Sequence, residues 1–147
     1  MTLAPFVLDP QLASDTVAVS QLPLCEVRLM NDKRYAWLVL VPQRAGMVEI
    51  SDLPDAEQAV LWQELNRVSA ALRSVAPCDK LNCGALGNIV RQLHLHVVAR
   101  REGDPAWPGP VWGHSPAQPY AGHALATRCA ALLDALDRGR PQTVDDR

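Results

Sequence analysis

Residues 81–100 read LNCGALGNIVRQLHLHVVAR, and the second half of this stretch decides the interpretation of the fold. From residue 92 to residue 97, polar and apolar side chains alternate, which is the period of a half-buried strand. Alternate side chains of a strand point to opposite faces. The sequence therefore predicts a strand over 91–99 with Gln92, His94 and His96 on one face, and with the leucines between them directed into the core.

Two neighbouring histidines on a strand face have three possible roles. A neutral imidazole can act as a nucleophile toward phosphorus, while its neighbour binds the phosphate oxygens or assists the leaving group. Both rings can instead bind one metal ion, because residues i and i+2 of a strand can reach the same ion. They can also be ordinary polar residues on a half-exposed strand. The spacing of His94 and His96 alone leaves all three open.

The residues before this strand favour an anion site. A strand is expected around residues 81–85, with Asn82 on it and Gly84 near its end, and Gly87 and Asn88 follow in a turn. Glycine lets backbone amides approach an anion closely, and asparagine supplies a neutral donor and acceptor. A tight connection would explain the glycines equally well. Together with the two histidines, however, these residues predict a phosphate site.

The rest of the chain supplies further elements. Residues 24–30 alternate apolar and polar side chains, and residues 35–41 form an apolar run, so each predicts a strand. The polar Asn-Asp turn between them predicts an antiparallel hairpin. A helix is expected from a cap at Asp52 to the residue before Pro77. Its apolar residues recur at steps of four and three and form one face, and its leucines and Trp62 are expected in the core. A short helix opens at residues 9–10, and a last helix is expected over 121–138. This order indicates an α+β domain with one antiparallel sheet.

Composition limits the function classes. The 147 residues, 16.1 kDa, fit one domain, and a net charge of −2 without a basic cluster disfavours binding to a tract of DNA or RNA. No apolar stretch is long enough to span a membrane, and no secretory signal is expected. Four cysteines in such a chain are expected to be reduced thiols, with Cys78 and Cys83 buried. The expected location is the cytoplasm.

The pattern NCG…GN…QLHLHVVAR, followed by a Trp-Pro-Gly segment, resembles the histidine triad (HIT) proteins over residues 20–115. The resemblance implies a single HIT-like domain over residues 1–147. It implies an α+β fold with an antiparallel sheet of about five strands, a central helix and a C-terminal helix. It also implies a homodimer that acts on nucleotides with a substituted α-phosphate, such as dinucleoside polyphosphates or nucleoside phosphoramidates.

The resemblance also implies roles for single residues. His94 matches the nucleophile that forms a nucleotidyl-histidine intermediate, and His96 matches the histidine that contacts the phosphate and assists the leaving group. The phosphate-binding positions fall on Asn82, Gly87 and Asn88. Covalent attack requires no cofactor, although a divalent cation can accompany a polyphosphate substrate. The alternative is a nucleotide-binding protein with little or no turnover.

Two residues depart from the family pattern. Gln92 stands at the first histidine position, where it can hydrogen-bond to substrate but cannot titrate. Ile89 stands where many relatives have a hydroxyl that contacts the phosphate, so one donor is lost. Other side chains near the motif have open roles: Trp107 and Trp112 can pack or cover the site, His114 can reach it, and Arg100 and Arg101 are expected at a solvated strand end.

Overall fold

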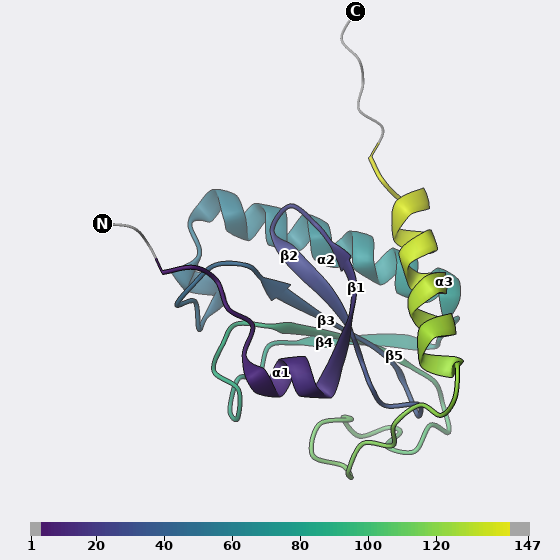
Figure 1. The fold of residues 1–147 in the computed structure, drawn as a ribbon. Helices are drawn as coiled ribbons and strands as arrows, with labels where there is room; N and C mark the ends of the chain where they lie inside the picture. The colour runs from purple at the N-terminus through teal and green to yellow at the C-terminus, as the bar shows by residue number, and fades with distance from the viewer. Residues whose placement is uncertain (1–3, 142–147) are drawn as a thin grey trace, which may run out of the picture.

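The structure, a computed structural model, describes residues 4–141 and shows an α+β fold (Figure 1). Its elements are α1 (Pro10–Asp15), β1 (Thr16–Gln21), β2 (Cys25–Met30), β3 (Ala36–Pro42), the 3-10 turn η1 (Ile50–Asp52), α2 (Asp55–Val75), β4 (Lys80–Gly84), β5 (Leu95–Arg100) and α3 (Ala124–Arg138). Within the described residues, no helix is long and apolar enough to cross a membrane.

The five strands form one antiparallel sheet in the order β1-β2-β3-β5-β4. The predicted hairpin is confirmed as β2 and β3, with Val27 opposite Leu40. Strand β1 was not predicted from the sequence. It lies at the sheet edge, is only six residues long, and contains an irregularity between Ala18 and Ser20 that interrupts the alternation of its side chains.

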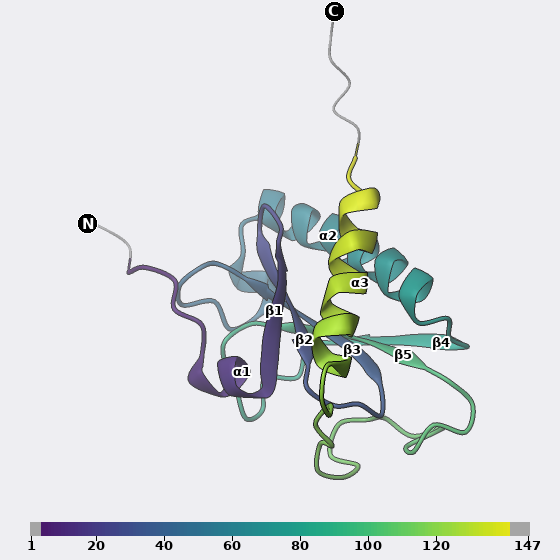
Figure 2. The same cartoon turned by 45° about the vertical axis from the view of Figure 1, so that its right-hand side comes forward.

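One face of the sheet is covered by α2 and α3, which lie side by side in both views (Figures 1 and 2). The apolar stripe of α2 packs on the sheet as its spacing predicts, and Leu61 and Leu72 are fully buried against Leu38 and Val97. Trp62, expected in the core, is instead 56% exposed, because it lies on the flank of α2 away from the sheet.

The start of α2 differs from the prediction. The helix begins at Asp55 after Pro54, and no side chain caps it. Asp52 belongs to the preceding 3-10 turn, where its carboxylate accepts hydrogen bonds from the backbone amides of Val48 and Glu49. Asp52 therefore accepts backbone hydrogen bonds as a capping residue does, but it caps the 3-10 turn η1 and not α2.

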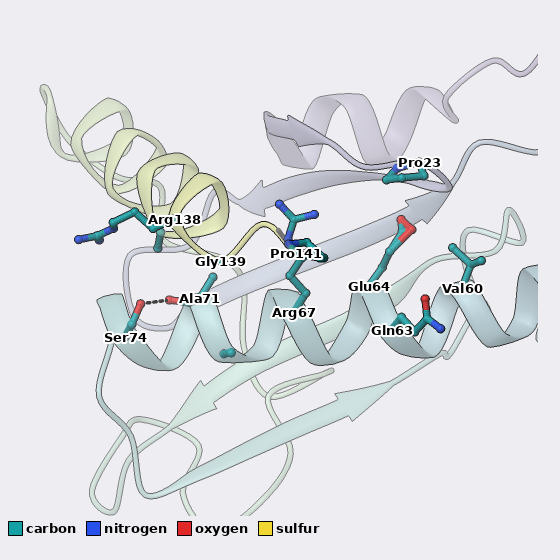
Figure 3. A pocket seen from close by; sticks show the side chains of 12 residues that line it. Pro23, Val60, Gln63, Glu64, Arg67, Ala71, Ser74, Arg138, Gly139 and Pro141 are labelled. Atoms are coloured by element: carbon teal, nitrogen blue, oxygen red, sulfur yellow. Dashed lines mark hydrogen bonds between the residues drawn. The ribbon is translucent and has the colours of Figure 1, made fainter. Parts of the chain in front are cut away.

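A buried carboxylate joins α2 to the turn between β1 and β2. Glu64, 5% exposed, accepts hydrogen bonds from the backbone amides of Leu24 and Cys25, the latter at 2.8 Å. It borders a cavity of about 740 Å3 between α2 and the end of α3, which Arg67 also lines (Figure 3). Burial raises the pKa of Glu64 above its ordinary value, although the two amides oppose this shift.

The opposite face of the sheet carries a second apolar cluster. Trp37, Val39 and Val98 from the strands pack there against Leu12 of α1 and Val111 of the segment between β5 and α3. This second face lies outside the layer that α2 and α3 cover, so it can accommodate a ligand site.

The segment after β5 is fixed by a buried ion pair. Arg100, expected at a solvated strand end, is 1% exposed and donates two hydrogen bonds to the Asp104 carboxylate, at 2.7 and 2.9 Å. The Arg100 guanidinium lies 5.6 Å from the Trp107 ring, so it is enclosed by the loop that it organises. Arg101 remains exposed.

Candidate active site

A cleft of about 690 Å3 opens on the second face of the sheet. Side chains from α1, the β2–β3 turn, the segment before β5 and the segment after it form its walls. The residues that carry the argument below are Leu12, Trp37, Gly87, His94, His96 and Trp112.

His94 and His96 lie next to each other at the floor of this cleft. Their ring centroids are 4.9 Å apart in an edge-to-face arrangement, and each residue is 6% exposed. The strand is shorter than predicted: β5 begins at Leu95, so His94 precedes its first residue. The two rings nevertheless meet as the alternating pattern predicts.

A backbone carbonyl determines which nitrogen of His94 carries the proton. Nδ1 of His94 lies 2.7 Å from the carbonyl oxygen of Gln92. Because a carbonyl oxygen only accepts hydrogen bonds, Nδ1 must carry the hydrogen, and in the neutral ring Nε2 then has the free lone pair. His94 is thus held in the tautomer that can act as a nucleophile through Nε2.

His96 is held in the other tautomer. The indole Nε1 of Trp37 donates a hydrogen bond to Nδ1 of His96 at 2.9 Å. An indole N–H only donates, so Nδ1 of His96 is the acceptor and its Nε2 carries the hydrogen. Burial, followed by the neighbouring His94, lowers the pKa of His96 from 6.5 to about 3. His96 is therefore a neutral hydrogen-bond donor at physiological pH.

The low pKa of His96 predicts a loss of stability in mild acid. Below pH 6.5 the unfolded chain binds a proton at this ring that the folded protein does not, so the free energy of unfolding falls by about 1 kcal/mol for each pH unit toward pH 3. Urea unfolding measures the free energy of unfolding of the wild type and of His96→Gln at pH 7 and pH 5.5. The loss between these two pH values should be larger for the wild type than for the variant. A His96 that titrates near pH 6.5 by NMR would contradict it.

The predicted phosphate turn lies at the cleft. Gly87 and Asn88 both line it, and Gly87 has a φ of +72°, a conformation that favours glycine. Ile89 also lines the cleft and is 93% exposed, so it presents an apolar side chain where a hydroxyl would be a donor. The turn can offer backbone amides and the Asn88 side chain to an anion.

Asn82 is not among the residues that line the cleft. Its side-chain oxygen accepts a hydrogen bond from Arg100 at 2.8 Å, next to the Arg100–Asp104 ion pair. Trp112 packs near both Gly84 and His96: its ring centroid is 5.5 Å from that of His96, and a Cβ at position 84 would lie in van der Waals contact with its Cη2. In this structure Asn82 thus orders the protein around the site.

Gln92 is directed away from the cleft as well. Both polar atoms of its side chain bond the backbone of the N-terminal segment, which we define as residues 4–9. The sequence placed Gln92 with the two histidines on one strand face, but it lies three residues before β5 and does not line the cleft. Its main-chain carbonyl, rather than its side chain, contacts His94.

The remaining candidates divide between packing and surface. Trp112 lines the cleft, whereas Trp107 packs against Arg100 outside it. His114 is exposed and does not line the cleft, and its ring bonds the hydroxyl of its neighbour Ser115. Cys83, expected to be buried, is exposed.

The sequence did not reveal the role of two residues that shape the site. Trp37 is part of a strand that reads as uniformly buried, so nothing in the pattern shows that its indole N–H contacts His96. Leu12 lies in a six-residue helix that borders the cleft from another part of the chain. Both contacts depend on sheet register and loop paths, which local patterns do not encode.

The chemistry that this arrangement supports is nucleophilic attack on a bound anion. His94 offers a lone pair, His96 offers a neutral N–H donor beside it, and the turn at Gly87 lines the same cleft. Among residues 4–141, no group of three or more His, Cys, Asp or Glu side chains is placed to hold a metal ion.

Comparison with known proteins identifies the family and the fold. The family model described as "HIT domain" matches residues 11–103. A histidine triad protein from Sinorhizobium meliloti 1021 is 50% identical, with a TM-score of 0.86 over 88% of this chain and 96% of that one. A histidine triad protein from Marinobacter aquaeolei VT8 is 42% identical, with a TM-score of 0.89 over 93% and 100%.

A third solved structure, a histidine triad protein from Bradyrhizobium japonicum, is 45% identical, with a TM-score of 0.84 over 92% of this chain and 98% of that one. A search of curated protein sequences found no match. The HIT family is one of nucleotide-binding proteins that generally includes nucleotide hydrolases. From the domain match and these three structures, we conclude that the chain belongs to the HIT family.

Proposed function

We propose that this protein is a nucleotide hydrolase or nucleotidyl transferase that acts at the α-phosphate of nucleoside phosphoramidates or dinucleoside polyphosphates through a nucleotidyl-His94 intermediate. The observation that carries the proposal is the pair of opposite tautomers in one cleft. His94 has its lone pair on Nε2 because Gln92 O accepts from its Nδ1, and His96 has its hydrogen on Nε2 because Trp37 donates to its Nδ1.

In the first step, Nε2 of His94 attacks the α-phosphorus. A nitrogen–phosphorus bond forms, the bond to the leaving group breaks, and the electron pair departs with the leaving group, which takes up a proton from solvent. The positive charge that develops on His94 is stabilised by its Nδ1–H bond to the Gln92 carbonyl. The Nε2–H of His96 donates to the phosphate, and backbone amides of the turn at Gly87 donate further hydrogen bonds to its oxygens.

In the second step, water attacks the phosphorus and the nitrogen–phosphorus bond breaks. The nucleoside monophosphate leaves, one proton of the water is released, and His94 returns to its neutral tautomer. Hydrolase is favoured over transferase because no second substrate site can be recognised in the sequence. This route requires no cofactor, and a divalent cation would enter only with a polyphosphate substrate.

The assay that tests this proposal compares turnover with binding. Purified protein is incubated with adenosine phosphoramidate and, separately, with diadenosine polyphosphate, and release of adenosine 5′-monophosphate is followed by chromatography. Release from either substrate supports the hydrolase. Tight binding of the nucleotide without product release would instead favour the alternative, a nucleotide-binding protein with little turnover. The loss of a hydroxyl donor at Ile89 would then account for the low turnover.

We further propose that the protein is a homodimer. Two surfaces of the described chain suit a second copy: the outer edge of β4, which pairs only with β5, and the flank of α2 that carries the exposed Trp62. Sedimentation equilibrium should give twice the chain mass of 16.1 kDa, and Trp62→Asp should shift the equilibrium toward the monomer. A wild type that stays monomeric at micromolar concentration would contradict this.

We place the protein in the cytoplasm and propose no binding to nucleic-acid tracts or to membranes. Support comes from its four free cysteines and from its net charge of −2.

A further inference from the structure

The side chain of Gln92 fixes the N-terminal segment by two hydrogen bonds. Its Oε1 accepts from the backbone N–H of Asp9 at 2.9 Å, and its Nε2 donates to the carbonyl of Val7 at 2.8 Å. The two backbone groups flank Leu8, so the side-chain amide bonds this segment much as the N–H and C=O of one residue in a neighbouring strand would. The donor and the acceptor of this amide thus both have partners in a distant part of the chain.

The segment that Gln92 fixes leads directly into a wall of the cleft. Asp9 is the N-cap of α1, and its carboxylate accepts from the backbone N–H of Gln11 at 2.8 Å. Leu12, in the same helix, is 4% exposed and lines the cleft. The position of α1 therefore depends on where the backbone of Asp9 is held.

The same residue reaches the nucleophile through its main chain. The carbonyl of Gln92 accepts the hydrogen bond from Nδ1 of His94 at 2.7 Å. Gln92 is consequently bonded to the N-terminal segment on one side and to His94 on the other. Any change that moves its backbone affects both the cleft wall and the orientation of the imidazole.

We propose that Gln92 is a positioning residue, whose side-chain amide holds α1 in place as a wall of the substrate cleft. This inference rests on the proposed function for its kinetic consequence. Histidine cannot replace it, because the two ring nitrogens of an imidazole point in divergent directions and cannot bond the carbonyl of Val7 and the amide of Asp9 together. Glutamine at this position is thus matched to the N-terminal segment, and restoring the histidine triad should impair the enzyme.

The test uses three variants of the full-length chain. Gln92→His restores the triad, Gln92→Leu keeps the approximate size without hydrogen bonds, and Gln92→Glu keeps the acceptor for Asp9 but sets an oxygen against the carbonyl of Val7. The matched control is Gln58→Leu, which removes a side-chain bond of the same kind, from Gln58 Nε2 to Leu53 O at 2.8 Å, outside the cleft lining.

We expect all three Gln92 variants to raise KM for adenosine phosphoramidate about tenfold, with a smaller decrease in kcat, because the wall that contacts substrate is displaced. Hydrogen exchange at the backbone amides of Asp9 and Leu12 should become faster. Gln58→Leu should leave KM and both exchange rates unchanged, even if it lowers the melting temperature. A Gln92→His variant as active as the wild type, or more active, would overturn the proposal.

A second readout separates this proposal from the proposed function. If the wild type releases no product from either substrate, the hydrolase is wrong, but binding of adenosine 5′-monophosphate can still be measured by calorimetry. The Gln92 variants should then bind this nucleotide about tenfold more weakly and show the same faster exchange. Unchanged affinity or unchanged exchange in Gln92→Leu would overturn the positioning role, whatever the catalytic outcome.

Discussion

Replacing His94 by alanine should lower kcat/KM for adenosine phosphoramidate by on the order of a thousandfold or more. The variant loses the imidazole whose Nε2 carries the lone pair, because its Nδ1 donates to Gln92 O at 2.7 Å. The donors at His96 and at the Gly87 turn remain and still bind the phosphate. KM should consequently change far less than kcat.

The matched control for this variant is His114→Ala. His114 is an exposed histidine that does not line the cleft, so its removal should leave kcat/KM unchanged. Circular dichroism and urea unfolding establish that His94→Ala is folded, since His94 is 6% exposed and its loss leaves a small cavity. A folded His94→Ala variant with wild-type turnover would exclude His94 as the nucleophile.

The largest effect on stability is expected for Asp104→Ala. The Asp104 carboxylate accepts two hydrogen bonds from Arg100 and one from the backbone N–H of Trp107 at 2.8 Å, and the two charged side chains are 8% and 1% exposed. Removing it leaves a buried guanidinium without its counter-ion, which costs about 3 to 5 kcal/mol. The free energy of unfolding from urea titrations gives the value.

An exposed ion pair of the same type and spacing provides the comparison. Arg138 and Asp134 are also four residues apart, but their side chains are 70% and 66% exposed. Asp134→Ala should therefore change the free energy of unfolding by about 0.5 kcal/mol or less. Equal effects of the two substitutions would show that the Arg100–Asp104 pair does not hold the loop after β5 in place.

Local sequence patterns predicted most of the fold because its main elements have clear periods and boundaries. The alternation over residues 24–30 predicted β2, and the four-and-three spacing of leucines predicted the buried stripe of α2. Strand β1 was missed, since a six-residue edge strand with an irregular register shows little alternation. Trp62 was misplaced because the leucines and the tryptophan of this helix were all taken as core, whereas Trp62 lies on the exposed flank.

The candidate site was predicted less completely than the fold. Strand alternation brought His94 and His96 together, and the glycine turn was placed at the cleft. The hydrogen-bond partners of the His96 and Gln92 side chains could not be predicted. Trp37 is 59 residues from His96, and the two backbone groups that bond Gln92 are 83 and 85 residues from it. Such contacts follow from tertiary packing, which one sequence does not reveal.

Intact-protein mass spectrometry tests the covalent intermediate most directly. The wild type and His94→Ala are incubated briefly with adenosine phosphoramidate and quenched without acid, because a phosphorus–histidine bond is acid-labile. We predict a mass increase of one adenylyl group in the wild type and none in the variant. An adduct of equal abundance in His94→Ala, or substrate consumption by the variant at the wild-type rate, would contradict catalysis through His94.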